Sequence, residues 1–381
     1  MPVPIDYEVL RLIWWALLGI LLIGFAIFDG FDLGMAMLLP FVGRTNSERR
    51  VLINSVGPVW EGNQVWLLLG GGASFAAWPP LYAASFSGFY LAMFLVLVAL
   101  ILRPVAFKFR SKLDNAAWRT IWDWAMFIGG AVPSLIFGVA FGNLLQGVPF
   151  QFDADLRAVY TGSFFGLLNP FAVLCGLVSV MMLAAHGAAY VHMKTEGEIA
   201  ARARRAGITT SLLTVVLFAL AGVWVYGWIK GYALAQPMDH GGPSNPLRKS
   251  VEVSAGAWFG NYHVYPWTVA APLIGLIAPL LTAALLARGR AVAAFLFSAL
   301  ALFGIIATPG LAMFPFILPS SSAPNASLTA WDASSSQMTL FIMLVGTLIF
   351  LPIVLAYTAW VYRVLHGKVT PQSLEANRQA Y

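Results

Sequence analysis

The 381-residue sequence is 60% apolar and only 10% charged, whereas soluble domains carry roughly 25% charged residues. This composition excludes an ordinary soluble enzyme, and the single cysteine, Cys175, excludes an intramolecular disulfide. The net charge of +6 would also suit an acidic partner such as nucleic acid, so the distribution of the cations has to decide its meaning.

Apolar stretches free of Asp, Glu, Lys and Arg recur along the chain, and a membrane-spanning helix needs about 20 such residues. The stretch 62–102 is too long for one span and is broken by Trp78-Pro79-Pro80. No basic region precedes the first stretch, so we interpret it as a retained helix and not a signal peptide.

We therefore predict an all-α polytopic membrane protein, with one integral membrane domain over 1–381. Nine helices would allow two four-helix bundles plus one extra helix. The nine predicted helices lie near 10–39, 58–78, 81–105, 119–143, 163–192, 205–230, 262–287, 291–317 and 335–364.

The cations are distributed unevenly between the two ends of these predicted helices. Of the 22 Lys and Arg residues, 17 fall on one side and five on the other. Because cytoplasmic loops are enriched in Lys and Arg, the N-terminus is predicted to be periplasmic and the C-terminus cytoplasmic. The excess charge thus indicates topology and not a nucleic-acid partner. The 17 are Arg44, Arg49, Arg50, Arg103, Lys108, Arg110, Lys112, Arg119, Lys194, Arg202, Arg204, Arg205, Arg288, Arg290, Arg363, Lys368 and Arg378.

Acidic residues inside predicted spans are costly in a membrane and indicate function. Asp29 and Asp32 lie three residues apart, on nearly the same face of the first helix, and Glu61 begins the second. Two interpretations stay open for these three: a carboxylate-lined proton pathway from the cytoplasm, or ion pairs and helix caps. Arg103 ends the third helix and Asp123 begins the fourth on the same side, and for these two we favour a supporting ion-pair role.

Histidines bear on the question of cofactors. Of five, only His186 and His192 lie in or near a predicted span, and they are six residues apart, on different faces. A bundle that holds two haems needs axial ligands on facing helices, and this chain offers too few. We therefore expect no haem and no metal to be bound by this chain, and a packing or interfacial role for His186.

Several motifs resemble subunit II of cytochrome bd-type quinol oxidases, essentially from end to end. The resemblance is carried by residues 5–11 (IDYEVLR), 24–34 (GFAIFDGFDLG), 60–66 (WEGNQVW), 142–150 (GNLLQGVPF) and 312–320 (AMFPFILPS), followed by 325–329 (NASLT).

The resemblance implies an inner-membrane enzyme of bacteria that oxidises ubiquinol or menaquinol and reduces dioxygen to water. Haems b558, b595 and d would be held by subunit I, which this subunit would stabilise, with lipid and small accessory subunits as further partners. Acidic residues of the first two helices contribute to a proton pathway in this family. Asp32 and Glu61 match those positions, Asp29 lies close by, and some relatives carry Asp where this chain has Glu61. Some members also bind a quinone on subunit II.

A second function, from another class, is a secondary transporter or ion channel with intramembrane carboxylates, because Pro and Gly within spans could form broken helices. A transporter should work alone. An oxidase subunit should instead co-purify with a haem-bearing partner.

Overall fold

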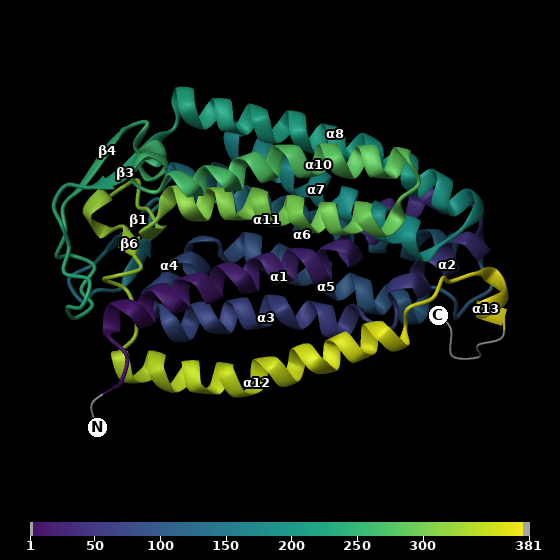
Figure 1. The fold of residues 1–381 in the computed structure, drawn as a ribbon, viewed down its shortest axis with the longest axis horizontal. Coiled ribbons are helices and arrows are strands. Elements are labelled where there is room, and N and C mark those ends of the chain that lie inside the picture. The colour runs from purple at the N-terminus through teal and green to yellow at the C-terminus, as the bar shows by residue number, and fades with distance from the viewer. Residues whose placement is uncertain (1–2, 376–381) are drawn as a thin grey trace.

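Long apolar helices run side by side along the molecule in the computed structural model, which describes residues 3–375 (Figure 1). The helices are α1 (Tyr7–Val42), α2 (Asn46–Val56), α3 (Trp60–Ala77), α4 (Pro79–Gly88), α5 (Tyr90–Phe109), α6 (Ala116–Gln146), α7 (Pro170–Lys194), α8 (Gly197–Trp228), α9 (Gly260–Val264), α10 (Ala270–Ala287), α11 (Ala291–Met313), α12 (Gln337–Val364) and α13 (Pro371–Glu375).

Three short antiparallel hairpins connect some of the helices. Their strands are β1 (Phe150–Phe152), β2 (Ala158–Tyr160), β3 (Lys230–Leu234), β4 (Val251–Ala255), β5 (Phe316–Leu318) and β6 (Leu328–Thr329), which pair as β1–β2, β3–β4 and β5–β6. All three hairpins gather at the end of the molecule where α1 begins, whereas α2 and α13 lie at the opposite end (Figure 1). The two ends therefore differ in structure as well as in charge.

Eight helical segments among the described residues are long and apolar enough to cross a membrane, and they include eight of the nine predicted spans. The segment missing from the eight is the one predicted over 58–78. It forms α3, which is 18 residues long, but its first turn carries Glu61, Asn63 and Gln64. These polar side chains lower the apolar character of α3 below that of the eight segments.

Several boundaries differ from the prediction. The helix expected over 81–105 is interrupted at Phe89, which separates α4 from α5, and the aromatic ring of Tyr160 packs against Gly88 there. The helix expected from 163 begins only at Pro170, where the Asn169 side chain accepts a hydrogen bond from the Ala172 amide as an N-cap. Conversely, α8 begins at Gly197 and not near residue 205. Arg202 and Arg204, which precede the predicted helix, therefore belong to α8.

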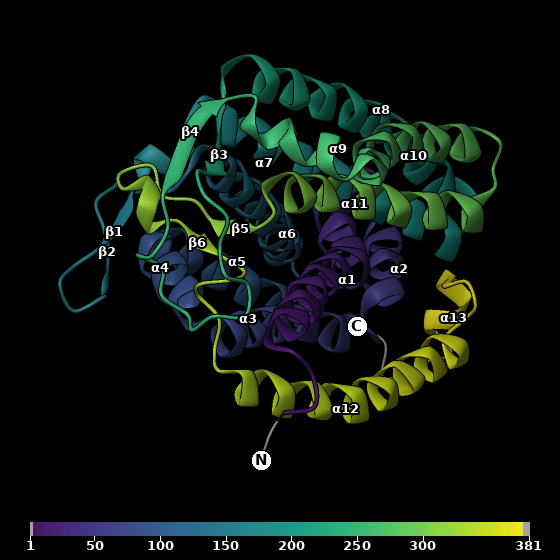
Figure 2. The same ribbon diagram turned by 60° about the vertical axis from the view of Figure 1, so that its left-hand side comes forward.

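Helix α1 lies at the centre of the packing and contacts α3, α6 and α7. Helix α5 packs on α6, whereas α7, α8, α10 and α11 pack on one another. Gly34 and Gly187 let α1 and α7 approach closely, because a Cβ at Gly34 would lie 2.1 Å from the Leu183 carbonyl oxygen. Helix α12 runs along the outside of α1 and α3 and is mostly exposed (Figure 2).

At the end of the molecule that carries the hairpins, Arg11 ties the long segment before β4 to α1. Its guanidinium donates hydrogen bonds to the Ser334 hydroxyl at 2.8 Å and to the carbonyl oxygens of His240 and Gly242 at 2.6 and 3.0 Å. It also lies 3.5 Å from the centre of the Tyr7 ring. A segment rich in turn-forming residues is thereby held against the helices.

Candidate functional site

Asp29 and Arg103 form a two-pronged ion pair between α1 and α5. The two terminal nitrogens of Arg103 lie 3.0 Å from the two carboxylate oxygens of Asp29, and both side chains are almost completely buried. Gly129 of α6 makes room for the arginine, since a Cβ there would lie 2.8 Å from Arg103 Cγ. The charge of Asp29 is therefore balanced inside the bundle.

Asp32, one turn further along α1, is equally buried but has a different environment. Its Oδ2 accepts a hydrogen bond of 2.8 Å from the amide nitrogen of Asn63 on α3. Its Oδ1 is buried and has no hydrogen-bond partner within the described residues. With Asp29 and Arg103, an ionised Asp32 would leave one net negative charge in the apolar interior, and a protonated Asp32 would leave none.

Glu61 does not join these two acids. It is exposed on the first turn of α3, and Asn63, two residues later, occupies the buried position beside Asp32. A carboxylate at a helix N-terminus is favourable in its own right. Of the three acids predicted for one pathway, the structure brings Asp29 and Asp32 into the same interior and places Glu61 on an outer surface.

Asp123 lies in a separate cluster near the end of the molecule that carries α2. It accepts a hydrogen bond of 2.5 Å from Arg110 Nε and one of 2.6 Å from Arg49. Within the described residues, no hydrogen bond or ion pair joins it to Arg103. Arg110 also donates to the Asn46 side chain at 2.9 Å. This network connects α2, α5 and α6.

His186 uses both of its ring nitrogens inside the protein. Nδ1 lies 2.7 Å from the Ser298 hydroxyl and Nε2 lies 2.9 Å from the carbonyl oxygen of Ile27, while the ring stacks on Phe295 at 4.7 Å. These contacts join α7, α11 and α1. Both ring nitrogens therefore have protein partners. No group of three or more His, Cys, Asp and Glu side chains in residues 3–375 could hold a metal ion.

The sequence analysis did not single out Asn63 and Tyr362. Asn63 contacts Asp32 directly, and Tyr362 contacts Asn63. Asn63 stood in a quoted motif but drew no attention beside the charged Glu61. Tyr362, on α12, donates a hydrogen bond of 2.7 Å to the Asn63 side-chain oxygen. An amide side chain at the start of a predicted span, two residues after Glu61, is the sequence signal that could have drawn attention to Asn63.

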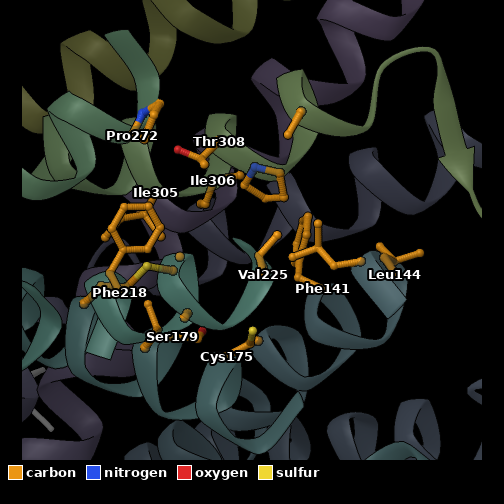
Figure 3. A pocket seen from close by; sticks show the side chains of 18 of the residues that line it. Phe141, Leu144, Cys175, Ser179, Phe218, Val225, Pro272, Ile305, Ile306 and Thr308 are labelled. Atoms are coloured by element: carbon orange, nitrogen blue, oxygen red, sulfur yellow. The ribbon is translucent and has the colours of Figure 1, made fainter. Parts of the chain in front are cut away.

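An apolar cavity of about 560 Å³ lies between α6, α7, α8 and α11. Phe141, Phe218 and Ile305 line it together with other apolar side chains, and the polar atoms of Cys175 and Ser179 lie at one side (Figure 3). The cavity contains no cluster of titratable groups. Its chemistry suits a long apolar molecule.

The Asp29–Arg103 ion pair leads to a prediction about the stability of the protein. Replacing Arg103 by Met should lower the free energy of unfolding by about 3–5 kcal/mol, because Asp29 would stay buried without its cation. The double variant Asp29→Leu, Arg103→Met should recover most of that loss. Arg119→Met is the matched control, because its partner Asp114 is exposed, and it should change stability by about 0.5 kcal/mol or less. A coupling near zero in this double-mutant cycle would contradict the assignment of the pair.

Comparisons with known proteins agree on one family. The model of the family "Cytochrome bd terminal oxidase subunit II" matches residues 10–365. The chain is 55% identical to cytochrome bd-I ubiquinol oxidase subunit 2 of Escherichia coli K12, with 98% of each chain covered. It is 31% identical to cytochrome bd ubiquinol oxidase subunit 2 of Bacillus subtilis, with 94% of this chain and 96% of the relative covered.

The fold is also similar to that of a solved structure. The bd oxidase of Geobacillus thermodenitrificans aligns with a TM-score of 0.67 over 93% of this chain and 98% of the matched chain, at 17% identity. The apolar helices and these relatives make the chain a multi-pass protein of the bacterial inner membrane. The chain belongs to the subunit II family of cytochrome bd terminal oxidases, which are quinol:oxygen oxidoreductases.

Proposed function

We propose that this chain stabilises a haem-bearing subunit I and supplies part of the path by which protons reach the site of dioxygen reduction. The observation that carries the proposal is Asp32, a buried carboxyl beside a balanced ion pair, with one oxygen that has no hydrogen-bond partner in residues 3–375. It lies ten residues before the end of α1 at Val42, a distance of about 15 Å along a helix. Under the proposal, protons that enter from that end of the molecule would cover this distance to reach Asp32.

The proposed orientation places α2 and α13 in the cytoplasm and the three hairpins in the periplasm. It rests on the uneven distribution of Lys and Arg. Of the 17 cations counted on the cytoplasmic side, Arg378 lies outside the described residues. Under this orientation, Asp29 and Asp32 belong to the cytoplasmic half of α1, where protons consumed in water formation would enter.

The outer face of α3 is our proposed contact with subunit I. Glu61 is exposed there in line with the exposed side chains of Val65 and Leu68. A carboxylate facing hydrocarbon is costly, whereas a polar or cationic group of a partner would compensate it. Haems b558, b595 and d would belong to that partner, and lipid or small accessory subunits would cover the remaining apolar surface.

We assign the quinone that some family members carry on this subunit to the apolar cavity between α6, α7, α8 and α11. Its volume and its lining of Phe, Ile and Leu side chains suit an isoprenoid tail. A photoreactive ubiquinone analogue should label residues such as Phe218 and Ile305 in the purified complex. If labelling occurs elsewhere on the chain and spares this cavity, the assignment is wrong.

Amide substitutions separate proton transfer from packing, because they keep size and hydrogen bonding but remove the titratable proton. Asp32→Asn and Glu61→Gln should assemble with normal haem content, and turnover should fall by about 100-fold for Asp32→Asn, on the scale of lost acid–base catalysis. Glu61→Asp should lower turnover less than Glu61→Gln does, because it keeps the carboxyl.

Asp114→Asn is the control, because that carboxylate is 95% exposed. A fully assembled double variant, Asp32→Asn with Glu61→Gln, that retains full quinol oxidase activity would end the proton-path proposal. Poor assembly of the variants would instead favour a structural role for these acids.

A further inference from the structure

Helices α1, α3 and α12 meet near Asp32, and α12 is far from the other two in the sequence. Asn63 of α3 donates from Nδ2 to Asp32 Oδ2 at 2.8 Å, and the hydroxyl of Tyr362 on α12 donates to Asn63 Oδ1 at 2.7 Å. Asp32 and Asn63 are 1% and 3% exposed. The result is an ordered chain of hydrogen bonds, from Tyr362 through Asn63 to one oxygen of the carboxyl.

The direction of each hydrogen bond follows from the number of hydrogens available. A tyrosine hydroxyl has one hydrogen, and here it points at the carbonyl oxygen of the Asn63 amide. This contact fixes the amide so that its NH₂ group faces Asp32. The opposite orientation would place an amide oxygen against a carboxylate oxygen, which is repulsive unless Asp32 carries the proton on that atom.

We infer that Asn63 and Tyr362 are positioning residues that hold Asp32 Oδ2 as an acceptor and leave Oδ1 as the oxygen at which Asp32 takes up and releases a proton. The inference rests on the proposed proton path and names the atom that serves it. In the step, a proton from water on the cytoplasmic side forms an O–H bond at Oδ1. The same bond breaks when the proton moves on, the carboxylate is regenerated, and no electron is transferred.

The charges around Asp32 are consistent with a carboxyl that alternates between two states. The titratable or charged side chains around it are Asp29 on α1, Arg103 on α5, Tyr190 on α7 and Tyr362 on α12. Arg103 is bound by Asp29, and the Tyr190 hydroxyl donates to the Ser55 carbonyl oxygen at 2.9 Å. Neither of them forms a hydrogen bond with Oδ1, which leaves Asn63 as the group that orients the carboxyl.

Helix α12 is attached mainly at its two ends, which makes the position of Tyr362 depend on a few contacts. Within the described residues, the buried side chains of α12 are Leu340 and Leu344, both in its first half. At the other end, Lys194 Nζ donates to the carbonyl oxygen of Leu365 at 2.6 Å, and Leu374 of α13 is buried against the end of the bundle. These contacts tie the end of α12 that carries Tyr362 to α7 and to the end of the bundle.

The test compares Tyr362→Phe with Tyr357→Phe in the purified two-subunit complex. Tyr357 is 64% exposed on the same helix, so its hydroxyl should not matter. Tyr362→Phe should lower turnover about fivefold, on the scale of one hydrogen bond, with unchanged haem content and unchanged KM for quinol. Asn63→Leu should lower it further, by about tenfold or more, because the carboxyl then loses its donor.

Two further readouts separate positioning from simple packing. The turnover–pH profile of Tyr362→Phe should shift to higher pH, because a misoriented Asn63 favours the ionised carboxylate less. The infrared C=O band of the protonated carboxyl, identified by its absence in Asp32→Asn, should also shift. Tyr357→Phe should match the wild type in both measurements.

The outcomes distinguish this inference from the proposal on which it rests. Wild-type turnover, pH profile and infrared band in Tyr362→Phe, together with an inactive Asp32→Asn, would overturn the positioning role alone. Full activity in an assembled Asp32→Asn would overturn the proton path itself. If Asn63→Leu does not assemble, Tyr362→Phe decides the matter, because it removes a single oxygen atom.

Discussion

A carboxylate inside an apolar helical bundle has to be neutralised, by a cation or by a proton. Asp29 and Asp32 lie one turn apart on the same helix but have different partners. Asp29 is bound on both oxygens by Arg103, whereas Asp32 receives one hydrogen bond from an uncharged amide. The Asp29–Arg103 pair therefore holds two opposite charges in place. Under the proposed function, Asp32 is the carboxyl that exchanges a proton, because no ion pair has to break.

The packing of α1 follows from this constraint. Its acidic face has to be enclosed by other helices, which requires small residues where backbones meet. Gly129 admits the stem of Arg103 from α5, and Gly34 and Gly187 bring α1 and α7 into backbone contact. Glu61 lies outside this enclosed region, on a face of α3 that a partner subunit could cover. Under the proposed function, a path that begins at a subunit interface would run from Glu61 at the surface to the two enclosed acids.

The spans could be predicted from the sequence because each needs a long apolar run, and such runs are visible in a single chain. The rotation of a helix about its axis could not be predicted, because it depends on which neighbour it contacts. The outcome for α3 shows this: Asn63 faces α1, while the more conspicuous Glu61 faces outward.

The partners of side chains that pair across long sequence separations could likewise not be predicted from the sequence alone. Arg103 was expected near the acids, but Asp29 lies 74 residues away in the sequence, and nothing local distinguishes it from Asp32 as the partner. Tyr362 is separated from Asn63 by 299 residues. Asp123 was expected in a supporting ion pair, and its partners, Arg49 and Arg110, come from the unpredicted helix α2 and the end of α5.

The most direct test of proton transfer through Asp32 is the rate of proton uptake during a single turnover of the reduced complex with dioxygen. The complex would be oriented in vesicles with a pH indicator on the side of α2 and α13. We expect the wild type to take up protons from that side, and Asp32→Asn to do so about 100-fold more slowly, with unchanged dioxygen binding to haem. Uptake at the wild-type rate in Asp32→Asn, or uptake from the opposite side, would contradict the account.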